Sequence, residues 1–146
     1  MFETISVIGG DLRQLTLAKL LQSEGYHIFL HGFDKDIQLE ELRNEDDLDI
    51  VMSSDIVILP VPVTFDGKTI NSPYCQNPLS IDDLLNGINP SAIVFGGQIQ
   101  PNLKKAFEEN SLAYRDYLKR EELSIKNAIP TALTIQLSNS NIKLSC

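Results

Sequence analysis

Cysteine is scarce in this sequence. Its two cysteines, Cys75 and Cys146, lie too far apart to form any recognised metal-binding spacing. We therefore expect reduced thiols with a structural or incidental role, and no metal site.

Long hydrophobic runs are also missing. No apolar stretch reaches the length that spans a bilayer, and the N-terminus lacks the basic-then-apolar pattern of a signal peptide. Hydrophobic residues make up 42% of the chain and charged residues 22%, as in soluble globular proteins. We expect a cytoplasmic protein without a membrane partner.

Positive charge is in short supply. Twenty acidic residues outweigh 12 basic ones, which gives a formal net charge of −8. Nucleic acids and anionic membranes bind to basic patches, so neither is an expected partner. An anionic small ligand would need a local group of positive charge. Much of the acid lies in residues 35–49, which we expect to be a solvated face or edge.

Short apolar segments alternate with helix-like segments along the chain. The strand-like segments span 4–9, 27–32, 55–61, 91–96 and 112–117. The helix-like segments span 12–25, 80–87 and 102–111. The 146 residues suit one domain. This order predicts an α/β fold, a three-layer Rossmann-like or flavodoxin-like open parallel sheet of about five strands with helices on both faces.

The first helix-like segment is amphipathic. Its apolar positions recur at three-residue steps, and a glycine follows it; these residues are Leu12, Leu15, Ala18, Leu21 and Gly25.

Two segments interrupt the regular alternation. Residues 62–90 form a long connection rich in Pro and Gly, which could line a site or be a plain surface excursion. Residues 120–140 are helix-like but contain Pro130, which predicts a kink or break near residues 128–129.

The first strand-to-helix turn has the outline of a dinucleotide-binding fingerprint without its glycines. Gly9 would be the first glycine of G-x-G-x-x-G, whereas Asp11 and Gln14 stand where the second and third belong. Asp11 is a good N-cap and Gln14 completes a capping-box spacing, so we expect both to close the helix end. A carboxylate there competes with phosphate for the same N–H groups. Asp34 could imitate a ribose-binding acid, but we do not expect nucleotide binding at this turn.

Ligands of open α/β sheets bind beyond the carboxyl ends of the strands. In this sequence those ends are Gly9-Gly10, residues 32–34, residues 60–62 and Gly96-Gly97. Paired glycines allow a ligand to approach closely, although a tight turn alone would explain either pair.

Arg13 falls in the first turn of the first helix, where a cation opposes the helix dipole. It could pair with Asp34, or it could hold a ligand carboxylate with two hydrogen bonds.

Other chemistries find little support in the residues. His27 and His31 share one strand face with Phe29, and we expect packing or partial exposure because no acid or cysteine converges on them. The third strand ends in Leu59-Pro60 rather than in the Asp of a phosphoacceptor receiver. Neither a Ser/Thr-rich flavodoxin phosphate loop nor a serine nucleophile elbow occurs in the sequence.

Five stretches, spread in order over nearly the whole chain, resemble the N-terminal domain of the dipicolinate synthase A-subunit family. They are VIGGDLRQL (7–15), HGFD (31–34), SDIVILPVP (54–62), IVFGG (93–97) and YLKREELSIKNAIPTA (117–132). The resemblance implies a two-domain oxidoreductase that oxidises dihydrodipicolinate to dipicolinate during sporulation. NADP or NAD would be bound by a C-terminal Rossmann domain, and residues 1–146 would be the single N-terminal, substrate-side domain, inactive by itself.

The resemblance also implies partners and a location. The expected partner protein is the flavoprotein-like B-subunit of dipicolinate synthase, and the expected compartment is the mother-cell cytoplasm of a sporulating bacterium. A homodimer could form as well.

A small dicarboxylate is the substrate that the resemblance implies. Arg13 with Gly9-Gly10, and Asn127 with Thr131 beside Pro130, are the candidate carboxylate contacts. Arg120 or Lys119 could serve instead. The rest of the candidate substrate-binding set is Asp11, Pro60, Gly96 and Gly97.

The catalytic group is not fixed by the resemblance. Glu121 is a candidate general base, and it stands with Glu122 where the family has an acid pair. After PTA the family usually has Glu-Gly, whereas this chain has Leu133-Thr134. If the Glu-Gly pair contacts the ligand or the second domain, this chain could be altered in activity.

Two alternatives stay open. The chain could be a stand-alone, non-catalytic α/β binding or assembly module, for example one that docks the B-subunit. It could also bind a nucleotide directly, against which the missing glycines argue.

Overall fold

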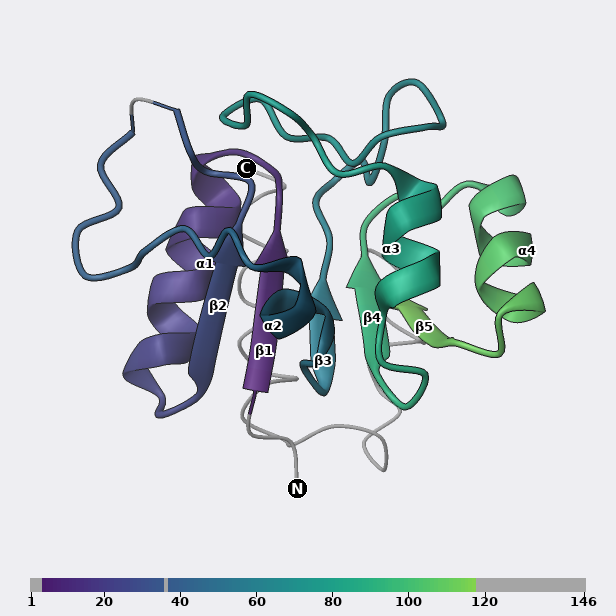
Figure 1. Ribbon diagram of the computed structural model, residues 1–146, viewed down its shortest axis with the longest axis horizontal. Helices are drawn as coiled ribbons and strands as arrows, with labels where there is room; N and C mark the ends of the chain where they lie inside the picture. The colour runs from purple at the N-terminus through teal and green to yellow at the C-terminus, as the bar shows by residue number, and fades with distance from the viewer. Residues whose placement is uncertain (1–3, 36, 118–146) are drawn as a thin grey trace.

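The computed structural model describes residues 4–35 and 37–117, which form one parallel sheet between helices (Figure 1). The strands are β1 (Thr4–Ile8), β2 (His27–His31), β3 (Ile56–Ile58), β4 (Ile93–Gly96) and β5 (Ala113–Asp116). Their order in the sheet is β2-β1-β3-β4-β5, and every neighbouring pair is parallel. The chain first moves from β1 to one edge, then returns past β1 to the other edge. The predicted open α/β sheet of five strands is confirmed, and its switch point lies between β1 and β3.

Helices cover both faces of this sheet. They are α1 (Leu12–Ser23), α2 (Leu48–Met52), α3 (Ile81–Gly87) and α4 (Pro101–Glu109). In β3, Ile56 and Ile58 join the core cluster that includes α1, while Val57 joins the cluster that includes the other helices. All three side chains are buried, as expected for a parallel strand covered on both sides.

Helix α1 buries the apolar stripe that its sequence predicted, with one exception. Leu15, Ala18 and Leu21 are in the core, but the side chain of Leu12 is 54% exposed because it lies at the very start of the helix. The glycine at the C-terminus behaves as predicted. Gly25 has φ +97°, and its N–H donates to the carbonyl of Gln22.

The acidic segment 35–49 leads into a short helix. Asp47 caps α2 by accepting a hydrogen bond from the backbone N–H of Asp49, 3.0 Å away. Val51 and Met52 of the same helix are buried. The described acidic side chains of this segment are exposed or half-buried, as expected of a solvated face or edge, and Asp47 and Asp49 also begin the five-residue helix α2.

The long connection after β3 turns back over the turn that follows β1. The backbone N–H of Gly10 donates to the carbonyl of Asn71, 2.7 Å away. A Cβ on Gly9, whose φ is +71°, would lie 2.8 Å from that carbonyl oxygen and 2.6 Å from Ser72 Oγ. The connection thus packs against a candidate binding turn.

The outer part of the connection is held by one carboxylate. Asp66 accepts hydrogen bonds from the backbone N–H groups of Lys68 and Thr69, both at 2.8 Å, and from the hydroxyl of Thr64. The backbone N–H groups of Thr69 and Lys68 hold the pKa of Asp66 well below its usual range. Beside it, Phe65 is 79% exposed.

The packing at Gly9 predicts a difference between two glycine substitutions. Gly25→Ala should cost about 1–2 kcal/mol of unfolding free energy, because only the positive φ is disfavoured and a Cβ would meet nothing within 4 Å. Gly9→Ala should cost roughly 1–3 kcal/mol more, because its Cβ meets backbone. Urea unfolding of both variants measures the difference, and equal costs would contradict the packing described.

Asp66 predicts a pH-dependent contribution to stability. Its pKa is lower in the folded than in the unfolded chain, so its contribution is complete above the ordinary value of 3.8 and is lost as pH falls towards the folded pKa. The thermal midpoint of Asp66→Ala should therefore lie below that of the parent chain at pH 6, by a margin that shrinks at pH 3. Thermal unfolding at both pH values checks this. A margin that stays constant would show that the charge of Asp66 contributes nothing.

Candidate functional site

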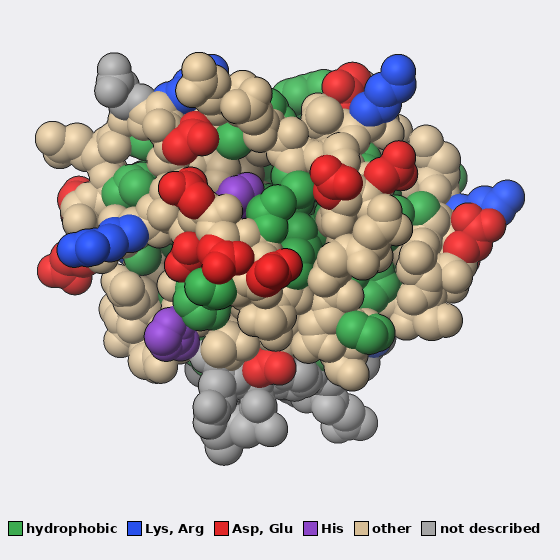
Figure 2. Space-filling view, in the orientation of Figure 1, with side chains coloured by type: hydrophobic (Ala, Val, Ile, Leu, Met, Phe, Trp, Pro, Cys, Tyr) green, Lys and Arg blue, Asp and Glu red, His purple; other side chains and the backbone are tan. Residues whose placement is uncertain are grey.

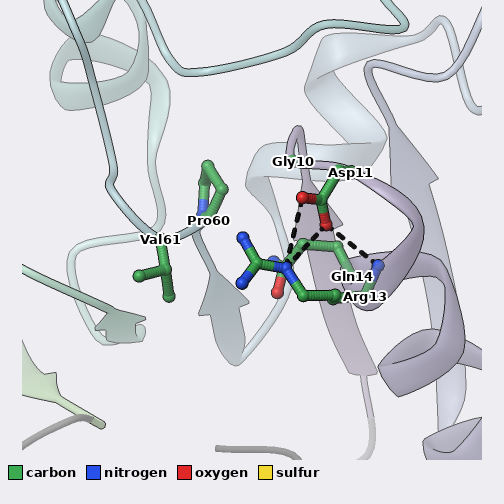
Figure 3. A pocket seen from close by; sticks show the side chains of 6 residues that line it. All are labelled: Gly10, Asp11, Arg13, Gln14, Pro60 and Val61. Carbon is green, nitrogen blue, oxygen red and sulfur yellow. Dashed lines mark hydrogen bonds and ion pairs between the residues drawn. The ribbon is translucent and has the colours of Figure 1, made fainter. Parts of the chain in front are cut away.

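A small pocket lies at the switch point of the sheet, where the turn after β1 meets the end of β3. It is lined by Gly10, Asp11, Arg13, Gln14, Pro60 and Val61 (Figure 3). The pairing of Val7 with Ile58 brings these two strand ends together. Four of the six lining residues were candidate substrate contacts from the sequence. Gln14 had been assigned only to the helix cap, and Val61 only to a strand end.

Asp11 closes the N-terminus of α1, as predicted. Its carboxylate accepts a hydrogen bond from the backbone N–H of Arg13, 2.9 Å away. The same carboxylate binds the Arg13 side chain, with Nε at 3.1 Å from Oδ1 and 3.2 Å from Oδ2. One acid therefore fixes both the end of the helix and the position of the arginine.

The pairing of Arg13 with Asp34 that the sequence left open is wrong. Arg13 pairs with Asp11, which is two residues away, whereas Asp34 accepts a hydrogen bond from the backbone N–H of Gln76 at 2.9 Å. The local partner prevails because Asp11 already sits at the helix end. Only Nε faces Asp11, and Figure 3 shows the terminal nitrogens of Arg13 on the side of Pro60 and Val61.

The predicted capping box between Asp11 and Gln14 does not form. The Gln14 side chain packs over Gly10 so closely that a Cβ on this glycine would collide with Gln14 Cγ. This packing buries Gln14, which is only 3% exposed. Its Nε2 has no hydrogen-bond partner among the residues that the structure describes. The capping-box spacing gave no signal for this second role, but Gln14 does stand at the third glycine position of the fingerprint.

The Gly96-Gly97 turn supports the pocket from behind rather than lining it. A Cβ on Gly97 would collide with the side chain of Val61, and the Gly97 N–H donates to the carbonyl of Pro60. Gly96 packs against Val63 in the same way. These two glycines, like Gly9, allow chain segments to pack closely.

Tyr117 lies just after β5 and near this region. It is fully buried, and its hydroxyl donates to the carbonyl of Leu59 at 3.3 Å. Burial raises the pKa of Tyr117 well above its usual range, although the nearby charge of Arg13 opposes the shift. Tyr117 thus donates this hydrogen bond as a neutral hydroxyl.

The pocket does not suit a dinucleotide. Its volume is about 10 Å³, room for roughly one water molecule. The Asp11 carboxylate occupies the helix end where a pyrophosphate would bind. Gly10 is covered by Gln14, and Asp34 is committed to Gln76. The small volume and the Asp11 carboxylate therefore both oppose a pyrophosphate at this turn.

The pocket can instead accept an anionic group of small size. The terminal nitrogens of Arg13 and the amide of Gln14 are hydrogen-bond donors, and both side chains line the pocket. An arginine fork is suited to a carboxylate. At most one carboxylate oxygen fits inside, so a larger ligand would lie mostly beyond the six lining residues.

Several predicted residues lie outside the part of the chain that the structure describes. These are Lys119, Arg120, Glu121, Glu122, Asn127, Pro130, Thr131, Leu133, Thr134 and Cys146.

The two histidines and Cys75 pack within the fold and form no metal site in the described residues. Within residues 4–35 and 37–117, no three His, Cys, Asp or Glu side chains form a group that could hold a metal ion. The His27 ring packs against Phe29, and His31 Nδ1 lies 2.6 Å from the carbonyl oxygen of Glu45. Cys75 is a buried free thiol, and burial raises its pKa.

None of the helices in the described part of the chain is both long and apolar enough to cross a membrane.

The surface shown in Figure 2 carries many acidic side chains, in line with the net charge of −8. Binding of an anion to this protein therefore depends on local donors such as those of the pocket.

This chain is similar to proteins named as the A-subunit of dipicolinate synthase. A curated relative, the A-subunit of dipicolinate synthase from Bacillus subtilis (strain 168), is 27% identical over 134 residues, which are 87% of this chain and 44% of the relative. A crystal structure of dipicolinate synthase from Bacillus subtilis has a TM-score of 0.69 at 24% identity, and the match covers 99% of this chain and 48% of that one. This chain thus spans less than half the length of these proteins.

A more distant structure shares the fold alone. It is a D-isomer specific 2-hydroxyacid dehydrogenase of Lactobacillus delbrueckii ssp. bulgaricus in its NAD complexed form, with a TM-score of 0.53 at 17% identity, over 97% of this chain and 43% of that one. The family model for the N-terminal domain of the dipicolinate synthase A-subunit matches residues 4–118. The chain therefore belongs to the family of N-terminal domains of the dipicolinate synthase A-subunit.

Proposed function

We propose that this chain is the substrate-side domain of a dipicolinate-synthase-like, NAD(P)-dependent oxidoreductase. The reaction proposed is the oxidation of dihydrodipicolinate to dipicolinate during sporulation, in which the substrate loses a hydride and a proton. The nicotinamide supplies the hydride acceptor, and we assign it to another domain. The work left to this chain is to bind and orient a dicarboxylate.

One observation carries this proposal, namely the arrangement of Asp11 and Arg13 at the turn after β1. The Asp11 carboxylate occupies the helix end, which opposes a pyrophosphate. The terminal nitrogens of Arg13 face the pocket, which favours a carboxylate. Together with the family match over residues 4–118, this supports a substrate site and not a cofactor site.

The proposal includes partners and location. The curated relative is named as one subunit of a synthase, so we propose that the whole protein works with the flavoprotein-like B-subunit. We also propose the cytoplasm of the mother cell as its compartment and a homodimer as its assembly.

The first test is calorimetric titration of the 146-residue chain with dipicolinate and, separately, with NADP. We expect dipicolinate to bind and NADP not to bind. Arg13→Ala should weaken dipicolinate binding at least about tenfold, because a charge-assisted hydrogen-bonded contact is lost. Arg13→Lys should recover only part of the affinity, because lysine keeps the charge but not the fork.

Arg43→Ala is the matched control, since Arg43 is an exposed arginine outside the pocket. It should bind dipicolinate like the parent chain. Binding of NADP would contradict the proposal and favour direct nucleotide binding. Binding of neither ligand would also contradict it and favour a non-catalytic module.

A further inference from the structure

The amide of Gln14 carries one of two buried side-chain nitrogens without a hydrogen-bond partner in the described residues, and the other is Arg115 Nε. The side chain of Gln14 is only 3% exposed. Most buried side-chain polar atoms in proteins have a partner, because an unpaired donor loses its hydration without compensation. An exception of this kind calls for a physical reason.

The position of Gln14 suggests that reason. In Figure 3 its amide lies behind the guanidinium of Arg13, and both groups line the same pocket. Arg13 is held by Asp11 through Nε only, so its terminal nitrogens are available on the pocket side. Two kinds of donor thus border a space that fits roughly one water-sized group.

We infer that Gln14 is a carboxylate-binding residue. Its Nε2 donates a hydrogen bond to one oxygen of a ligand carboxylate. The terminal nitrogens of Arg13 donate to the same carboxylate. This inference rests on the proposed function and deepens it, because it assigns to Gln14 a contact with the dicarboxylate that the sequence analysis had not assigned to it.

Hydrogen-bond direction, rather than net charge, makes the pocket selective. The charges of Asp11 and Arg13 largely cancel, since they form an ion pair at 3.1 Å. A neutral donor in the wall of the pocket adds attraction for an oxygen without another cation. It also favours a carboxylate over a neutral ring such as pyridine, which does not present two oxygens.

The test replaces Gln14 by a residue of similar length without a donor. Gln14→Met should weaken dipicolinate binding by roughly ten- to a hundredfold, the value of a hydrogen bond to a charged group. Its thermal midpoint should equal or exceed that of the parent chain, because an unpaired buried donor is removed. A merely structural role of Gln14 would lower the midpoint instead.

The matched control is Gln22→Met, the same replacement at an exposed position of α1. It should change neither dipicolinate affinity nor the thermal midpoint. If Gln14→Met binds dipicolinate like the parent chain while Arg13→Ala does not, the inference about Gln14 is overturned and the proposed function stands. If the parent chain itself does not bind dipicolinate, both are overturned.

A second measurement uses the parent chain and needs no variant. In the assigned ¹H–¹⁵N spectrum of the parent chain, the side-chain amide signals of Gln14 should shift on addition of dipicolinate, and those of Gln22 should not. Addition of pyridine should leave both pairs of signals in place. Dipicolinate shifts that spare the Gln14 amide would overturn the inference.

Discussion

The contact between the Asp11 carboxylate and the N-terminus of α1 sets the geometry of the pocket. By accepting the backbone N–H of Arg13, Asp11 occupies the end of the helix. By binding Nε of the same residue, it turns the remaining edge of the guanidinium towards Pro60 and Val61. One side chain thus removes the phosphate site of a dinucleotide fold and creates a small site with arginine donors.

The order of the strands places the end of β3 opposite Asp11 and Arg13, where it forms the other side of the pocket. Because β1 and β3 are neighbours, the end of β3 reaches the turn after β1, and Pro60 and Val61 come from there. Gly97 supports Val61 from behind, where a side chain would collide. On the other side, the connection that follows β3 packs on Gly9 through Asn71. Gly9 and Gly97 therefore allow close packing around the pocket, while Gly10 lines it.

Much of the fold could be predicted from the sequence, because periodicity and turn residues report burial directly. Helix α2 could not, because its five residues, which begin at the end of the acidic segment, show too short a pattern. The cap at Asp11 was predictable because it depends on neighbours in sequence. The burial of Gln14 was not, because it depends on packing over Gly10. Val61 was predicted only as part of a strand end, because its place in the pocket follows from the order of strands in the sheet.

The most direct test of this site is a crystal structure of the chain with dipicolinate bound. We expect one carboxylate at the turn after β1, within hydrogen-bond distance of the terminal nitrogens of Arg13 and of Gln14 Nε2, with Asp11 still capping α1. A ligand bound elsewhere on the chain, or an Asp11 displaced from the helix end by the ligand, would contradict the assignment of this pocket to the substrate.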